Sequence, residues 1–158
     1  MSEISGENLA TLEKRYRLTF LIFLTQICAV LILVVVAWIW LPKIETSLAS
    51  RDLTALWVGI LFIAIGSFVL RRLFFNWERL KNIVLLKGVP GLLGTLRTNS
   101  VILGLMAEII AIIGFLIALL SGNSSDMLRA AAISTVVFLI NFPRKSVWKK
   151  IISNLEKV

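Results

Sequence analysis

The sequence predicts an all-α, polytopic membrane protein with four transmembrane helices and both termini in the cytoplasm. The chain of 158 residues is 58% hydrophobic, and its mean hydropathy of +0.92 is well above that of an ordinary soluble domain. Its apolar residues gather in runs of about the twenty residues that cross a bilayer. Its basic residues lie almost entirely on one side of these runs. Together these three observations predict the fold class.

Four apolar runs are long enough to be membrane spans. They cover residues at about 18–41, 53–70, 100–120 and 127–142, and the fourth run is the shortest. A soluble bundle would have to bury four helices that are apolar on every side, and a chain of this length has too few other residues to cover them. We therefore expect a single transmembrane domain over residues 1–158.

The distribution of basic residues orients the predicted spans. Lys and Arg precede the first span, fill the segment between spans two and three, and follow the fourth span. The opposite side carries only Lys43, Arg51 and Arg129. By the positive-inside rule, we expect a multi-pass protein of the cell (inner) membrane with cytoplasmic N and C termini. The net charge of +8 then reflects topology and contact with lipid headgroups, and it does not indicate nucleic-acid binding.

Two segments outside the spans have a helical pattern. Residues 73–86 carry an apolar stripe, either as a cytoplasmic extension of the helix of span two or as a helix lying on the membrane. The glycines and proline of "GVPGLLG" (88–94) predict a turn region before span three. We expect residues 146–158 to form an amphipathic cytoplasmic tail on the membrane surface, with docking to a partner subunit as the alternative. Its apolar face comprises Val147, Trp148, Ile151, Ile152 and Leu155.

The sequence carries no set of residues for conventional enzyme chemistry. It has no histidine and a single cysteine, Cys28, which lies within span one. These counts predict no metal site and no intramolecular disulfide. The short motifs of serine hydrolases, phosphate-binding loops and zinc proteases are also missing. We therefore predict a non-catalytic protein without a cofactor.

One carboxylate, Glu108, interrupts the apolar stretch "GLMAEIIAIIGFLIALLSG" (104–122) of span three. It lies about nine residues beyond Asn99, or about 14 Å into a hydrocarbon core about 30 Å thick. Hydrocarbon disfavours a charged group, so we expect Glu108 to be protonated and hydrogen-bonded. The candidate partners at the same depth are Thr25, Gln26, Ser134 and Thr135.

Span three also carries a continuous stripe of small residues beside Glu108. Its members recur at spacings of three and four residues, and they are Gly104, Ala107, Ala111, Gly114 and Ala118. A stripe of this kind lets another helix approach closely. We therefore predict that it is a helix-packing surface.

Residues 96–120, "LRTNSVILGLMAEIIAIIGFLIALL", resemble the second helix of the c subunit (proteolipid) of rotary ATP synthases. The matching residues are Ala107-Glu108, Ala111-Ile112 and Gly114. The resemblance covers about residues 88–120, and spans one and four have no counterpart in that two-helix family. It implies that Glu108 is an ion-binding carboxylate.

The resemblance also bears on which ion Glu108 would bind. Sodium-binding members of the c-subunit family commonly have a hydroxyl residue directly after the carboxylate and a tyrosine five positions on. Here those positions hold Ile109 and Ile113, neither of which has a side-chain oxygen. Sodium needs several oxygen ligands, whereas a proton needs the carboxylate and one acceptor. The resemblance therefore implies H⁺.

Two functions remain open from the sequence. In the first, the chain is an accessory or assembly subunit of a larger membrane complex, with the small-residue stripe as its contact surface and Glu108 as a buried, protonated hydrogen-bonding group. In the second, it is a proton-binding or proton-translocating protein that uses Glu108 in the manner of a c-subunit hairpin. The expected partners are the lipid bilayer, further copies of the chain or other membrane subunits, and H⁺ in the second case.

Overall fold

The computed structural model describes residues 6–40 and 53–155, and every regular element in these ranges is a helix. The helices are α1 (Gly6–Trp40), α2 (Thr54–Phe74), α3 (Trp77–Ser121), α4 (Ser124–Asn141) and α5 (Lys145–Leu155). Within the described ranges, four helices are long and apolar enough to cross a membrane. The all-α class and the four candidate spans are thus confirmed. Lys43, Arg51 and residues 156–158 lie outside the described ranges.

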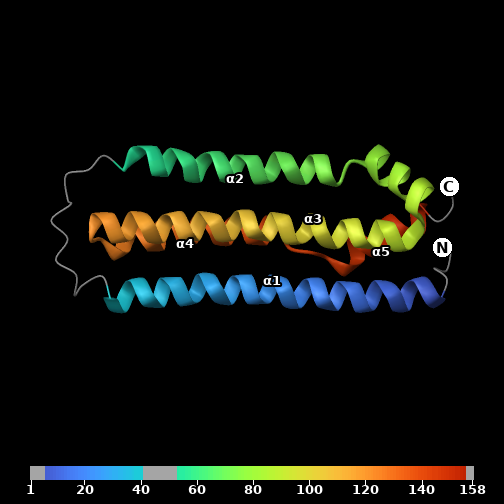
Figure 1. Cartoon of the computed structure of the whole chain (residues 1–158), viewed down its shortest axis with the longest axis horizontal. Coiled ribbons are helices and arrows are strands. Elements are labelled where there is room, and N and C mark those ends of the chain that lie inside the picture. Colours follow the sequence, from blue (N-terminus) through green and yellow to red (C-terminus); the bar gives the residue numbers. More distant parts are fainter. Residues whose placement is uncertain (1–5, 41–52, 156–158) are drawn as a thin grey trace.

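The helix α3 is the centre of the bundle. It contacts α1, α2 and α4, with its most extensive contact against α4, and it lies between α1 and α2 (Figure 1). The beginning of α1, the beginning of α3 and the whole of α5 lie at the same end of the bundle (Figure 1). The side chains of α3 therefore point either toward α1, α2 or α4, or away from the bundle.

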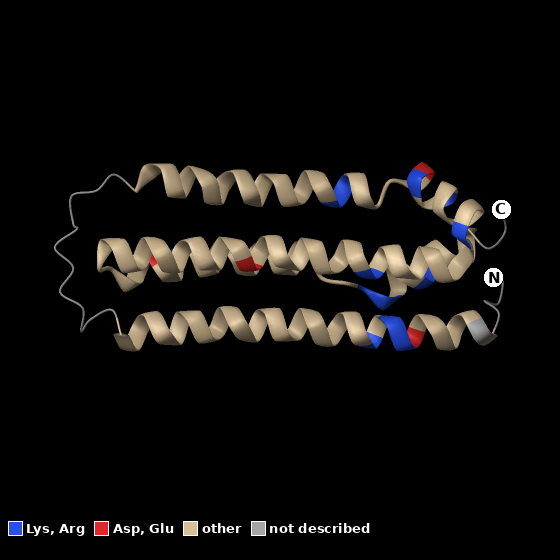
Figure 2. Cartoon of the chain, viewed as in Figure 1, with Lys and Arg blue, Asp and Glu red and all other residues tan. Residues whose placement is uncertain are grey.

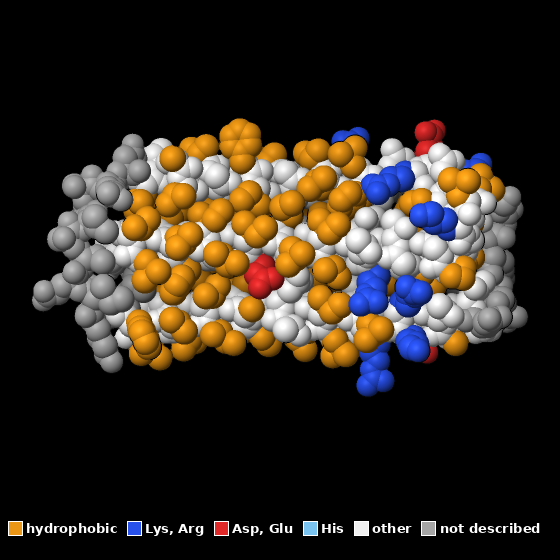
Figure 3. Space-filling view, viewed as in Figure 1, with side chains coloured by type: hydrophobic (Ala, Val, Ile, Leu, Met, Phe, Trp, Pro, Cys, Tyr) orange, Lys and Arg blue, Asp and Glu red, His pale blue; other side chains and the backbone are white. Residues whose placement is uncertain are grey.

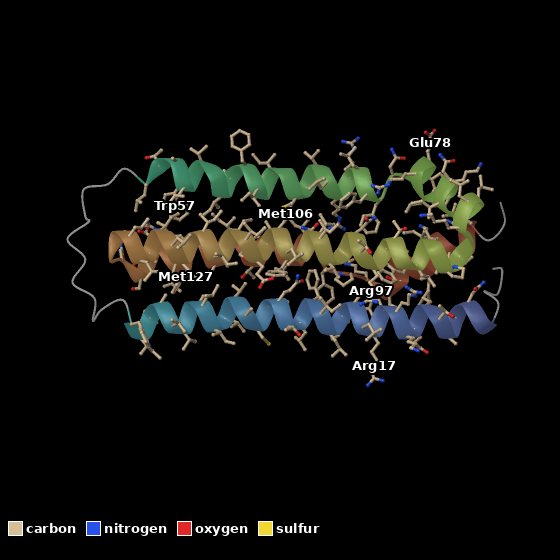
Figure 4. All side chains as sticks on the ribbon, in the orientation of Figure 1. Arg17, Trp57, Glu78, Arg97, Met106 and Met127 are labelled. Atoms are coloured by element: carbon tan, nitrogen blue, oxygen red, sulfur yellow. The ribbon has the colours of Figure 1, made fainter. Side chains whose placement is uncertain are left out.

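The described basic residues other than Arg129 gather at that same end, which we call the basic end (Figure 2). Arg17 of α1 and Arg97 of α3 both lie there, whereas Trp57 lies toward the opposite end (Figure 4). Arg129, near the start of α4, is paired with Asp126 at 3.4 Å. Between the two ends, the visible surface is covered by hydrophobic side chains (Figure 3). A surface of this kind suits contact with lipid hydrocarbon.

The segment after span two begins a new helix and does not extend α2. The helix α2 ends at Phe74, and the side chain of Asn76 accepts a hydrogen bond from the backbone N–H of Glu78 at 3.1 Å. This is an N-cap, which satisfies a donor that the first turn of a helix leaves free. Of the two alternatives for residues 73–86, the continuation of the span-two helix is therefore wrong, because that helix ends at Phe74 and a new helix begins at Trp77.

The turn region predicted at 88–94 is reduced to a kink at one residue, Gly88. Gly88 has φ of 66° and ψ of −176°, a positive-φ conformation that glycine adopts at little cost. Pro90 follows within the first turn of the continuing helix, where its missing N–H is not needed. From there the helix runs without a further break to Ser121, so span three extends further toward the basic end than predicted.

The tail helix α5 packs against the chain itself. Trp148 is 1% exposed, and Ile152 and Leu155 are equally buried. They form a hydrophobic cluster, here called the basic-end cluster, with leucines of α1 and α3: Leu12, Leu80, Leu92, Leu93 and Leu96. Four of the five residues of the predicted apolar face are thus buried against the chain itself, whereas Val147 is 42% exposed. This corrects the expectation that the whole face lies on the membrane or docks a partner subunit.

Candidate functional site

Glu108 lies at the border between the buried and the exposed side of α3. The neighbouring exposed residues recur at helical spacing and are Leu105, Ile109, Ile112 and Leu116. Glu108 itself is half-buried, because it projects between this exposed row and the small-residue stripe. Figure 3 shows an acidic side chain among hydrophobic ones midway along the bundle. Between Glu78 and Asp126 the sequence has no other acidic residue than Glu108.

The side chain of Glu108 has no hydrogen bond and no ion pair within residues 6–40 and 53–155. Three of its four predicted partners donate to backbone carbonyl oxygens instead. Thr25 donates to Leu21 at 3.0 Å and Thr135 to Ala131 at 2.8 Å, each within its own helix. The third, Ser134, donates across the α3–α4 contact to Ala107 at 2.7 Å. The carboxyl group thus lies in an apolar setting with its hydrogen-bonding capacity unused.

The fourth predicted partner, Gln26, is buried against the same side of α3. Its side chain is 7% exposed, and its Oε1 atom has no hydrogen-bond partner in the described chain. It covers Gly104, where an added Cβ would lie 2.2 Å from Oε1. Gly104 precedes Glu108 by four residues, or one helical turn. The chain therefore holds a free acceptor one turn away from the carboxyl group, without a bond between them.

The five residues of the small-residue stripe are all buried within the chain. A Cβ added to Gly114 would lie 2.0 Å from the Cβ of Ala130 on α4, while Gly104 faces Gln26 and Phe23 of α1. The stripe therefore holds α3 against α1 and α4. This corrects one part of the first functional hypothesis, because a stripe that is covered by the chain's own helices does not serve as a contact surface for another subunit.

A polar cavity at the basic end was not anticipated from the sequence. It has a volume of about 140 Å³ and lies where the ends of α2 and α4 meet α3 and α5, and its polar residues are Arg71, Ser100, Asn141 and Arg144. Asn141 is the last residue of α4. Because asparagine is common at helix ends, the position of Asn141 in the sequence gave no indication of a functional site. The described residues contain no group of three or more His, Cys, Asp or Glu side chains that could hold a metal ion.

Comparisons of the chain with protein-family models, with curated proteins and with solved structures found no match.

Proposed function

We propose that this chain is a non-catalytic subunit of a larger membrane assembly, in which a transmembrane helix of another subunit covers the face of α3 that carries Glu108. The observation that carries the proposal is that Glu108 is half-buried, midway along the bundle, and without a partner in the described chain. This proposal retains the hypothesis of an accessory or assembly subunit. Its contact surface is the face of α3 with Leu105, Glu108 and Ile112, in place of the small-residue stripe.

The physical reason is the cost of a polar group in hydrocarbon. A charged side chain near the bilayer centre is expensive, and a protonated carboxyl group still has a donor that lipid tails cannot satisfy. A facing helix with an oxygen or amide at the same depth removes that cost, and such interhelical hydrogen bonds contribute about 1 kcal/mol. The exposed leucine and isoleucine residues beside Glu108 supply the apolar contact around it.

The proposal includes a topology. Both termini and the α2–α3 junction lie in the cytoplasm, and the protein is multi-pass in the cell (inner) membrane. The support is the gathering of basic residues at the end of the bundle that carries α5 (Figure 2), since cytoplasmic segments next to spans are enriched in Lys and Arg.

Photocrosslinking in native membranes tests the contact. A photoreactive amino acid at Ile109, which is 40% exposed beside Glu108, is expected to form a covalent adduct with a membrane protein. The control position is Phe62 of α2, which is 75% exposed and should form adducts with lipid. An adduct of twice the chain mass identifies a second copy, and any other mass identifies a different subunit.

Substitutions at Glu108 complete this test. Glu108→Gln keeps hydrogen-bonding atoms and should preserve the adduct from Ile109, whereas Glu108→Leu should abolish most of it without unfolding the chain. Equal protein adducts from Ile109 and Phe62, or an adduct that is unchanged by Glu108→Leu, would show that this face does not mediate assembly.

The proton-binding function remains a second candidate because of one observation. Gln26 Oε1 is a buried acceptor without a partner, one turn of α3 away from Glu108. A protonated carboxyl group could donate to it after a rotamer change and release the proton on returning. The resemblance to the c subunit supports the same role for Glu108, with H⁺ as the ion because Ile109 and Ile113 offer no further oxygen.

Carbodiimide labelling tests this second candidate. The reagent modifies protonated carboxyl groups, and the half-exposure of Glu108 leaves it accessible from the lipid side. We expect labelling at Glu108 to fall as the pH is raised and to be unaffected by sodium. Gln26→Leu, which removes the acceptor at similar volume, should change the extent of labelling at constant pH. Protection by millimolar sodium at constant pH, or labelling unaffected by Gln26→Leu, would contradict the proton-binding arrangement.

A further inference from the structure

The cavity at the basic end contains a buried amide without a partner. Asn141, the last residue of α4, is 5% exposed, and both Nδ2 and Oδ1 lack a hydrogen bond within the described chain. Burying a polar group without a partner is costly, so such groups are normally satisfied by protein, water or a ligand. The cavity of about 140 Å³ beside it far exceeds the roughly 15 Å³ that admits one water molecule.

Two guanidinium groups share this cavity. Arg71, from the last turn of α2, is half-buried, and Arg144, from the segment between α4 and α5, is close enough for the two positive charges to repel each other. Neither guanidinium group has an ion pair or hydrogen bond in the described chain, and the residues lining the cavity include no acid. Two unpaired like charges around one cavity fit an anion between them.

The fourth polar group is the hydroxyl of Ser100, from α3. Ser100 is 2% exposed, and its hydroxyl makes no hydrogen bond in the described chain. The cavity thus offers two guanidinium groups, one hydroxyl and one amide N–H as donors. This set matches the oxygens of a phosphate group, which accept several hydrogen bonds at once. The amide Oδ1 adds one acceptor, which suits a ligand that also carries a hydroxyl group.

An apolar groove lies between α2 and α4, the two helices whose ends meet at the cavity. It is lined almost wholly by hydrophobic side chains, among them Ile65, Phe68, Val136 and Ile140. Phe68 precedes Arg71 by one turn of α2, and Ile140 directly precedes Asn141 on α4. On both helices the groove residues thus begin within about one turn of the cavity residues and continue toward the middle of the bundle, where hydrocarbon chains of a bilayer lie. A free phosphate ion would use the cavity and leave the groove empty.

We propose that this is a binding site for one anionic glycerophospholipid, with its phosphate in the cavity and an acyl chain in the α2–α4 groove. Arg71 and Arg144 bind the phosphate oxygens, and Asn141 Nδ2 and the Ser100 hydroxyl donate to them. Asn141 Oδ1 accepts a hydrogen bond from a headgroup hydroxyl. The site lies where α2 and α4 end, between their apolar segments and the basic end, and this is the depth at which lipid headgroups lie.

Native mass spectrometry of the full chain in detergent tests the site, with phosphatidylglycerol as the probe. We expect one molecule to be retained and phosphatidylcholine to bind more weakly, because its quaternary ammonium offers no donor and adds positive charge. Arg144→Gln and Arg71→Gln should each weaken phosphatidylglycerol binding about tenfold or more, as loss of a charge-assisted hydrogen bond predicts. The matched control is Arg72→Gln, since Arg72 is exposed and does not line the cavity.

Asn141→Leu separates lipid binding from folding. The substitution replaces an unpartnered amide by an apolar side chain of similar volume. In the absence of lipid, the melting temperature should therefore stay the same or rise. Stabilisation by phosphatidylglycerol should largely disappear. Equal stabilisation of Asn141→Leu and the parent protein would overturn the proposal, as would equal retention of lipid by Arg144→Gln and Arg72→Gln. If inorganic phosphate protected the parent protein as well as the lipid does, the acyl-chain assignment would be wrong.

Discussion

Replacing Gly114 with alanine is expected to destabilise the protein by about 1–3 kcal/mol, the usual cost of forcing extra carbon into a packed contact. The added Cβ would lie 2.0 Å from the Cβ of Ala130 and 3.5 Å from its Cα. Neither atom can move by a rotamer change, so the backbones of α3 and α4 must separate. Thermal unfolding in detergent or nanodiscs measures the loss, and Gly114→Leu should prevent folding altogether.

Two other glycines serve as controls for this result. Gly66 of α2 has nothing within 4 Å of an added Cβ, so Gly66→Ala should be neutral or stabilise by up to about 1 kcal/mol through helix propensity. Gly104→Ala should cost less than Gly114→Ala, because its nearest neighbour is the flexible end of Gln26. Equal melting temperatures for the three alanine variants would show that α3 and α4 are not in close contact at Gly114.

Trp148→Ala is expected to cost about 3–5 kcal/mol, as large-to-small changes of a buried aromatic residue do. Trp148 is 1% exposed, and its ring meets that of Tyr16 edge to face at a centroid distance of 5.8 Å. The hydroxyl of Tyr16 in turn donates to the carbonyl oxygen of Pro143 at 3.1 Å. Loss of the indole should therefore detach α5 from the basic-end cluster. Faster proteolysis of the C-terminal tail, together with a lower melting temperature, would report this.

The control for Trp148→Ala is its neighbour Val147, which is 42% exposed. Val147→Ala should change the stability by no more than about 0.5 kcal/mol, as is usual for surface positions. A different pattern would arise if α5 lay on the membrane. Both variants would then leave the melting temperature in detergent unchanged, and proteolysis of the tail would depend on whether lipid was present.

The residues around Glu108 show where prediction from the sequence ended. The position of Glu108 midway along a span follows from counting residues, because a helix rises by a constant 1.5 Å per residue. Depth alone indicates its candidate partners. Depth does not determine how each helix is rotated, and so it could not show that Ser134 donates to Ala107 or that Gln26 packs on Gly104. Asn141 had no signal at all, since it is enclosed only where the ends of α2 and α4 meet α3 and α5.

The sequence by itself determined the all-helical class, the number and approximate positions of the candidate spans, and the gathering of basic residues at one end. These are properties of each segment's own composition, summed over about twenty residues, and they do not depend on what the segment contacts. Only the tertiary structure decided that the small-residue stripe is covered within the chain, that α5 packs on the basic-end cluster, and that Arg71 and Arg144 share a cavity. Each of these depends on which faces of separate helices meet, and a helix with several apolar faces leaves that choice open until neighbouring side chains exclude the alternatives.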